Sequence, residues 1–295
     1  MLLLPATTML LGYNTNGLAH HHPADALALL ADLGYQAVGI TLDHGWLNPY
    51  SEYFASDLRQ WQTWVQKYQF RTVIETGARF LLNSREKHEP TLVSTDAAAR
   101  QLRINFYERA IHIATELNSD CVSLWSGVLR ESAGDDELIS ARLVDGLEKV
   151  LTTAERYGMP IGFEPEPGMF VESMLQFEEL KRRLPHPLLK LTLDIGHLHC
   201  LGEVPIADHV RQWQTELVNV HLEDMRAGVH EHLPFGEGEI DFGPVLAALR
   251  EMNYSNGVYV ELSRDSHRAP TVAAAAMDFL RERCSRFEGL KQTLR

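Results

Sequence analysis

Cysteine, positive charge and long apolar runs are all scarce in this sequence. The three cysteines, Cys121, Cys200 and Cys284, are odd in number and far apart, so we expect no disulfide framework and assign the chain to a reducing compartment. The 27 Lys and Arg residues are outnumbered by 40 Asp and Glu residues, which gives a formal net charge of −13. Because such a surface repels phosphate backbones, we expect no nucleic-acid partner.

Membrane segments and a secretory leader are also missing. No apolar run reaches the roughly 18 residues that span a bilayer. The apolar start, MLLLPATTMLLGY (1–13), has neither a cationic leading segment nor a small-residue cleavage site, and we interpret it as a short flap that leads into a first strand. These absences predict a soluble, cytoplasmic protein without a membrane partner.

Glycine-rich phosphate-binding turns are absent as well, because no G-x-G-x-x-G or P-loop pattern follows an apolar run. Instead, short apolar runs alternate with amphipathic stretches eight times, which favours a closed parallel barrel over an open nucleotide-binding sheet. The predicted strands lie at 9–13, 36–42, 71–77, 120–126, 160–168, 191–193, 217–224 and 257–263. The predicted helices lie at 24–33, 57–68, 96–117, 136–157, 173–184, 206–216, 241–254 and 270–284. The sequence therefore predicts an α/β protein, a single (β/α)8 TIM barrel with an extra C-terminal helix, as one domain over residues 1–295.

Four successive predicted strands carry a possible metal ligand at their carboxyl ends. The clearest lies in LKLTLDIGHLH (189–199), where a buried strand at 191–193 is followed by Asp194 at its carboxyl end. In a barrel of this kind the carboxyl ends of the strands open on one face, so three carboxylates meeting there need a shared counter-ion. We predict one divalent ion, Mn, Mg, Co or Zn, because an oxygen-rich ligand set with open positions suits these metals. The predicted ligands are Glu164, Asp194, His221 and Glu261.

Each of these residues also has a purely structural interpretation. A strand-end Asp can cap a helix, and a buried His can bond to a backbone carbonyl. Glu164 and Glu166 compete for the place at the fifth strand. We favour Glu164 because it ends the apolar run IGF, whereas Pro165 and Pro167 indicate that the strand is already ending at Glu166. Glu166 is then a supporting residue or a substrate contact.

Histidines surround the predicted metal site. His197 follows Asp194 by three residues, and His230 and His232 lie in the predicted loop HLEDMRAGVHEHLPFGEGEIDF (221–242), which Gly236 and Gly238 bend back. Two alternate imidazoles beside a metal could bind substrate or a second ion; a solvated loop is the alternative. We include all three histidines among the predicted substrate-binding residues.

Further candidates follow the earlier strands, on the face where a substrate would enter. Arg79, Lys87 and His88 could hold an anionic group, although loop cations are commonly only solvated. Trp46 or Trp125 could stack on a sugar ring or pack in the core. The full set is His20–His22, Asp43, His44, Trp46, Glu75, Arg79, Lys87, His88 and Trp125, of which Glu75, Arg79 and Trp125 are predicted substrate contacts.

Five segments resemble the xylose isomerase-like barrel superfamily, and the resemblance covers nearly the whole chain. This superfamily includes ketose 3-epimerases, sugar-phosphate isomerases, inosose dehydratases, dehydroshikimate dehydratases and type IV apurinic endonucleases. The segments are FEPEPG (163–168), LDIGH (193–197), VHLED (220–224), PFGEGEIDF (234–242) and YVELS (259–263).

The resemblance implies a role for each candidate. One ion held by the four predicted ligands would bind the carbonyl and a neighbouring hydroxyl of a sugar or cyclic polyol. Glu164 and Glu261 would remove and return a proton as catalytic acid and base. His197 matches the D-x-x-H histidine, a substrate contact in the isomerases and a metal ligand in the endonucleases. His232 falls at the histidine of the endonuclease D-R-H loop motif.

The chain departs from the endonuclease pattern. The ends of the third and fourth strands, ETGAR and LWSG, offer no histidine, and His230 stands where the loop Asp would be. One metal is therefore expected.

The leading hypothesis is a metal-dependent isomerase or epimerase of a sugar, sugar phosphate or cyclic polyol ketone. The alternatives are a dehydratase, a phosphoesterase of endonuclease type, and a non-catalytic polyol-binding barrel; association into homo-oligomers stays open.

Overall fold

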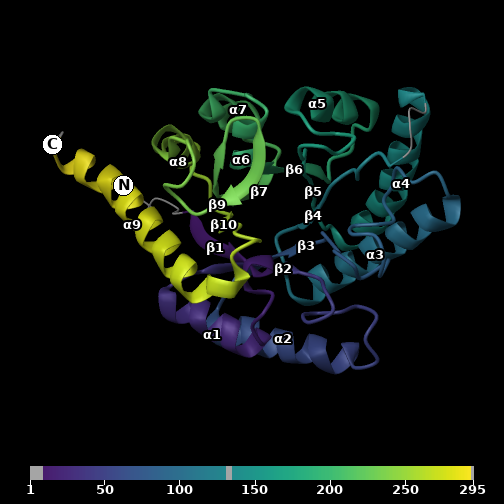
Figure 1. The fold of residues 1–295 in the computed structure, drawn as a ribbon, viewed down its shortest axis with the longest axis horizontal. Helices are drawn as coiled ribbons and strands as arrows, with labels where there is room; N and C mark the ends of the chain where they lie inside the picture. Colours follow the sequence, from purple (N-terminus) through teal and green to yellow (C-terminus); the bar gives the residue numbers. More distant parts are fainter. Residues whose placement is uncertain (1–8, 131–134, 294–295) are drawn as a thin grey trace, which may run out of the picture.

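Eight parallel strands form a closed barrel, in the order β1-β10-β7-β6-β5-β4-β3-β2. The computed structural model describes residues 9–130 and 135–293, with side chains as far as residue 285, so residues 1–8 of the predicted flap lie outside the described residues. Figure 1 shows the strands at the centre with the helices around them. The barrel strands are β1 (Leu10–Asn14), β2 (Ala37–Thr41), β3 (Arg71–Glu75), β4 (Val122–Leu124), β5 (Ile161–Phe163), β6 (Leu189–Asp194), β7 (Leu217–Leu222) and β10 (Gly257–Val260). The predicted fold class is confirmed.

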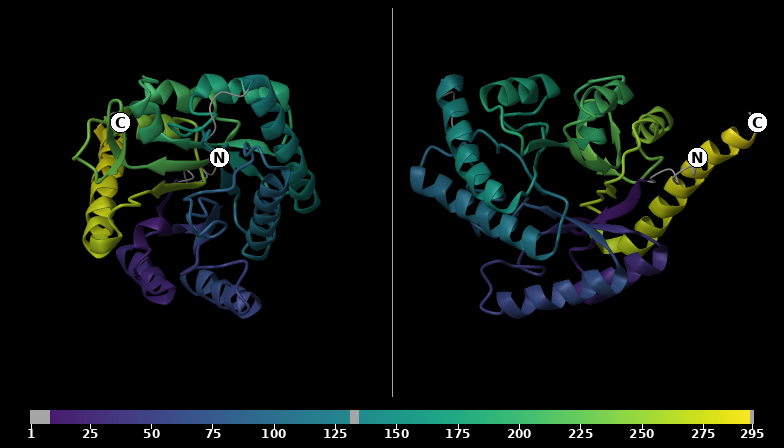
Figure 2. Two further views of the ribbon diagram at one scale, coloured as in Figure 1. Left: turned by 45° about the vertical axis from the view of Figure 1, so that its right-hand side comes forward. Right: turned by 180° about the vertical axis from the view of Figure 1, so that it is seen from behind.

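The long helices follow the strands as the amphipathic stretches predicted. Glycines end two of them in the left-handed conformation, Gly34 at φ 88° and Gly158 at φ 63°. Both views in Figure 2 show the helices at the periphery, with α9 at one edge of the molecule. The helices are α1 (Pro23–Leu33), α2 (Phe54–Tyr68), α3 (Ala97–Glu116), α4 (Asp136–Tyr157), α5 (Met174–Arg183), α6 (Ile195–Cys200), α7 (Ile206–Gln212), α8 (Phe242–Glu251) and α9 (Ala269–Thr293), with 3-10 turns η1 (Thr15–Leu18) and η2 (Ser266–Arg268). Within the described ranges, no helix combines the length and the apolar character that crossing a bilayer requires.

The segment after β7 is a hairpin rather than the predicted loop. Strands β8 (Asp224–Arg226) and β9 (Val229–Leu233) pair antiparallel, and Gly228 turns between them at φ 71°. The Asp224 carboxylate accepts the N–H groups of Met225, Gly236 and Ile240, which fixes both ends of the segment. The sequence did not reveal the hairpin because its strands are short and mostly polar, so that apolar alternation is absent.

A buried arginine on α3 holds the insertion that follows β3. Arg103 has no exposed surface, and its guanidinium donates to the carbonyl oxygens of Thr76, His88 and Pro90. The same group lies 5.1 Å from the ring centre of Trp125. The buried Arg103 thus holds in place the segment after β3, which contributes to the open end of the barrel.

Arg103→Met keeps most of the side-chain volume but removes the donors of three carbonyl groups. We expect the free energy of unfolding, measured by urea denaturation, to fall by about 3 kcal/mol. Arg156→Met, an exposed change on α4, is the control and should stay within about 0.5 kcal/mol of the unchanged protein. Equal free energies of unfolding in the two variants would contradict a stabilising role for the hydrogen bonds of Arg103.

Candidate metal centre and substrate cavity

Four side chains meet at the carboxyl ends of neighbouring strands. Glu164 directly follows β5, Asp194 ends β6, His221 lies in β7, and Glu261 directly follows β10. One ligand atom from each lies within 4.8 Å of the others. The Nδ1 atom of His221 is 2.9 Å from Glu261 Oε2, 3.1 Å from Glu164 Oε1 and 3.8 Å from Asp194 Oδ2. The structure therefore brings together the four predicted ligands around one ring nitrogen.

Asp194 serves as a helix cap and also faces this group. Its Oδ1 atom accepts the His197 N–H at 2.8 Å, so it is the N-cap of α6. Its Oδ2 atom is buried and has no hydrogen-bond partner among the described residues. The two interpretations of Asp194 are thus compatible, because each carboxylate oxygen has a different neighbour.

His221 is held from behind by a second carboxylate. Its Nε2 atom is 3.0 Å from Glu75 Oε1, and the same oxygen accepts a 3.0 Å hydrogen bond from the Asn219 amide. A carboxylate behind a ligating imidazole fixes the ring and keeps the proton on the far nitrogen. The sequence predicted Glu75 as a substrate contact, and Glu75 does line the cavity. Because its carboxylate contacts His221, we propose that its role is to position that ring.

Glu75→Gln should weaken binding of a divalent ion by about 10- to 100-fold, because the neutral amide orients and polarises His221 less well. Metal titration followed by calorimetry measures this affinity directly. Glu203→Gln is the matched control, since the Glu203 carboxylate accepts the Met174 N–H on another part of the molecule. Unchanged affinity in Glu75→Gln would show that Glu75 does not support the ligand.

The charges at this centre are poorly balanced by the protein itself. Burial raises the pKa of Glu164 to about 7, against the opposing effect of His221. Burial also acts to raise the pKa of Glu261, but His221, His232 and the Asn16 amide hold it below its ordinary value. Burial acts to lower the pKa of His221, yet the surrounding glutamates raise it well above its usual range. His221 is thus the basic side chain in direct contact with Glu164 and Glu261.

The donor set fits a divalent cation. It contains three carboxylates and one imidazole, a combination that suits hard and borderline ions. In the described part of the chain, no Lys or Arg pairs with Glu164, Asp194 or Glu261. Glu166 lies outside the group and lines the cavity instead. Burial raises the pKa of Glu166 to about 8, and the negative charges of Glu164 and Glu261 contribute to this increase.

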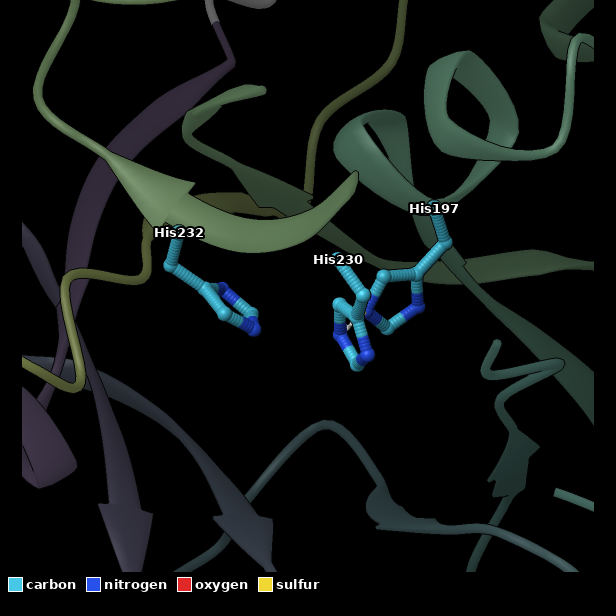
Figure 3. A group of neighbouring side chains, drawn as sticks. All are labelled: His197, His230 and His232. Atoms are coloured by element: carbon cyan, nitrogen blue, oxygen red, sulfur yellow. Dashed lines mark hydrogen bonds between the residues drawn. The ribbon is translucent and has the colours of Figure 1, made fainter. Parts of the chain in front are cut away.

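Three histidines form one wall of the same cavity. Figure 3 shows His230 against His197, and His232 extending from β9 beside them. The Nε2 atoms of His197 and His230 are 3.1 Å apart, and one ring nitrogen of each histidine lies within 4.8 Å of the others. Burial lowers the pKa of His197 to about 4, whereas Glu223 outweighs burial and raises that of His232 to about 10. The wall thus combines a neutral and a charged imidazole.

Several residues of this region escaped the sequence analysis. Asn14 and Asn16 donate amide hydrogen bonds to Glu261 at 3.2 and 2.7 Å. Glu223 is fully buried and accepts the Gly196 N–H at 3.1 Å. A Cβ atom on Gly196 would lie 2.0 Å from that carboxylate, so a larger residue there would displace the Glu223 side chain. The available signals were the polar NTNG after the first strand and the second acidic residue of VHLED.

The cavity above the four-residue group has a volume of about 500 Å³. Its lining includes the three histidines of the wall together with Glu75, Arg79, Lys87, His88 and Trp125. Trp125 contacts the His88 ring edge-on, with ring centres 5.4 Å apart. Trp46 instead packs in the core against Trp61, at 5.9 Å. The other predicted entry-face residues, His20–His22, Asp43 and His44, are not among the described residues that line this cavity.

Comparison with known proteins gives a consistent group of relatives. Residues 27–283 match the family model described as xylose isomerase-like TIM barrel. The L-ribulose-5-phosphate 3-epimerase UlaE of Salmonella paratyphi C is 26% identical over 214 residues, which cover 72% of this chain and 74% of the relative. An inosose dehydratase of Clostridium beijerinckii is 33% identical over 140 residues, 42% of this chain and 47% of the relative.

Solved structures share the fold at lower identity. The D-allulose 3-epimerase from Methylomonas sp. in complex with D-allulose has a TM-score of 0.74 at 18% identity, covering 94% of this chain and 98% of that one. The IolI protein with a bound zinc atom has a TM-score of 0.74 at 20% identity, with coverages of 94% and 99%.

Proposed function

Because the chain belongs to the xylose isomerase-like TIM barrel family, we propose that it is a metal-dependent epimerase or isomerase of a ketose. The observation that carries the proposal is the group of Glu164, Asp194, His221 and Glu261, three of which, Glu164, His221 and Glu261, line an open cavity. Two of the similar proteins are 3-epimerases, one of L-ribulose 5-phosphate and one of D-allulose, and both of these sugars are ketoses. These similar proteins support a ketose or ketose phosphate as the class of substrate.

The four-residue group would hold one divalent ion, and the zinc atom in the IolI structure supports this assignment. When bound, such an ion supplies electrophilic polarisation of a substrate carbonyl, which makes the adjacent C–H more acidic. Asp194 and His221 act only as ligands in this proposal. Glu75 and the α6 backbone hold these two side chains in place.

Glu164 and Glu261 perform the proton transfer. They come from β5 and β10, which are separated in the barrel by β6 and β7, so they approach the space above His221 from different sides. One carboxylate removes the proton next to the carbonyl, and the other returns a proton to the opposite face. Return to the same carbon inverts its configuration, whereas delivery to the neighbouring carbon gives an isomer. In this proposal His197 and His232, which line the cavity, hold the substrate hydroxyls.

Dehydration is the second candidate, favoured by the similarity to the inosose dehydratase. It begins with the same proton removal but ends with loss of the hydroxyl on the β-carbon. The product distinguishes the reactions, because dehydration releases water and forms a carbon–carbon double bond. A third possibility, phosphodiester hydrolysis, would require two or three ions per chain.

The test is proton exchange with solvent. The protein, loaded with Mn or Mg, is incubated in deuterated water with ketoses, ketose phosphates and inososes. We expect one of these compounds to take up deuterium on the carbon next to its carbonyl. Absence of deuterium uptake and of a dehydrated product in every compound would reject the proposed function.

A further inference from the structure

Two loops bring positive side chains to the cavity that contains the buried carboxylates. Arg79 and Lys87 belong to the insertion after β3, Arg264 belongs to the loop after β10, and all three line the cavity. The Arg264 side chain is 59% exposed, whereas the side chains of Glu164 and Glu261, which also line the cavity, are 8% and 15% exposed. The cavity therefore has an acidic floor and a basic rim, which we define as Arg79, Lys87 and Arg264.

The two guanidinium groups of the basic rim are fixed in place. Arg79 donates through Nη2 to the backbone oxygen of Asn16 at 3.3 Å, and the Asn16 amide donates to Glu261 at 2.7 Å. Arg79 is therefore tied to the same residue that contacts the acidic floor. Arg264 donates to Glu231 Oε1 and to the His230 carbonyl oxygen, both at 3.3 Å.

Arg79 and Lys87 have no carboxylate partner among the ion pairs of the described residues. The cations of the basic rim also repel one another. Burial lowers the pKa of Lys87 most, the charge of Arg79 lowers it further, and Arg264 adds a lowering effect that is smaller than the opposing effect of Glu166. A bound anion would relieve this repulsion.

His88 is not part of the basic rim, although the sequence placed it with Arg79 and Lys87. Its Nδ1 atom lies 2.6 Å from the Gly77 carbonyl oxygen, so this nitrogen carries a proton and donates it there. Burial lowers the pKa of His88 to about 4, so the ring is neutral near pH 7. It supports Trp125 through their edge-on contact.

We propose that the basic rim binds the phosphate group of a phosphorylated ketose whose carbonyl end lies over the acidic floor. This inference rests on the proposed function and specifies its substrate class. Arg79 and Lys87, the two rim cations without a carboxylate partner among the described ion pairs, together balance the charge of a phosphate dianion, whereas Arg264 is paired with Glu231. Guanidinium groups also bind phosphate oxygens in pairs. The cavity of about 500 Å³ is within the usual range for sites that enclose small ligands.

The experiment compares Arg79→Gln and Lys87→Gln with Arg85→Gln. Arg85 is an exposed cation of the same insertion that does not line the cavity, so it controls for loss of charge and for altered folding. Binding of inorganic phosphate is measured by calorimetry, and KM is measured for a ketose and for its terminal phosphate ester. We expect Arg79→Gln and Lys87→Gln to weaken phosphate binding and to raise the ratio of KM for the ester to KM for the free ketose by about 10- to 100-fold each. Arg85→Gln should change neither.

The outcomes separate this inference from the proposed function. Phosphate binding that is lost in Arg79→Gln but retained in Arg85→Gln supports the basic rim, even if no ketose is turned over. Turnover of free ketoses and their esters with equal KM, unaffected by either rim variant, would overturn the basic rim while leaving the epimerase assignment intact. Equal losses in all three variants would also overturn it, because general charge would then explain the binding.

Discussion

Glu164→Gln and Glu261→Gln should each lower turnover of the ketose substrate by about 10²- to 10⁴-fold, the usual contribution of one acid–base group. Glutamine keeps the shape of the side chain and one oxygen ligand but cannot accept the substrate proton. The measurement is kcat together with the rate of deuterium uptake from solvent. Loss of epimerisation in both variants is expected, because inversion needs a carboxylate on each face of the substrate, whereas deuterium uptake should be lost only in the variant that lacks the carboxylate facing the substrate C–H.

Glu203→Gln is again the control, because it changes a glutamate that contacts α5 rather than the cavity. Metal content is measured on all three variants, so that a loss of the ion is not mistaken for a loss of the base. If either Glu164→Gln or Glu261→Gln retains full kcat with the ion bound, that residue does not transfer the proton.

Asp194→Ala should have the largest effect on metal binding. The change removes the Oδ2 atom that has no hydrogen-bond partner among the described residues. We expect affinity for Mn or Zn to fall by more than about 100-fold. This loss is larger than the one expected for Glu75→Gln, because Glu75 contacts a ligand and is not itself a ligand. Elemental analysis after gel filtration gives the number of ions per chain, and titration gives the affinity.

Asp194→Ala also removes the N-cap of α6, which costs about 1 kcal/mol of stability by itself. Asp194→Asn separates the two effects, because the amide oxygen still accepts the His197 N–H while the negative charge is gone. Metal loss in both variants, with stability restored in Asp194→Asn, supports a ligand. Retention of the ion in Asp194→Ala would leave Asp194 with a capping role alone.

The barrel and the convergence of four residues could be predicted because both depend on local patterns. Apolar runs of strand length alternate with amphipathic helices, and a parallel barrel places every strand end on one face. Asp194 and Glu261 therefore meet, although 67 residues separate them, without any knowledge of individual contacts. The same rule put Glu164 ahead of Glu166, since only the former directly follows the buried run IGF.

The contacts that refine this site depend on residues far apart in the chain. Asn16 and Glu261 are 245 positions apart, and Glu75 and His221 are 146 apart. Neither pair has a local signature, because an asparagine or a glutamate after a strand is equally compatible with a solvated loop. The same holds for Arg103, whose three carbonyl partners lie in an irregular insertion.

The sequence by itself determined the fold class and the set of carboxylates and imidazole at the strand ends, because the periodicity of apolar residues specifies which side chains leave the core and where. Tertiary structure alone decided which atoms face each other: that Glu75 stands behind His221, that a hairpin carries His230 and His232 to the cavity, and that Arg79 and Lys87 share its rim with Arg264. These arrangements follow from loop packing and from hydrogen bonds between distant segments, which no local pattern encodes.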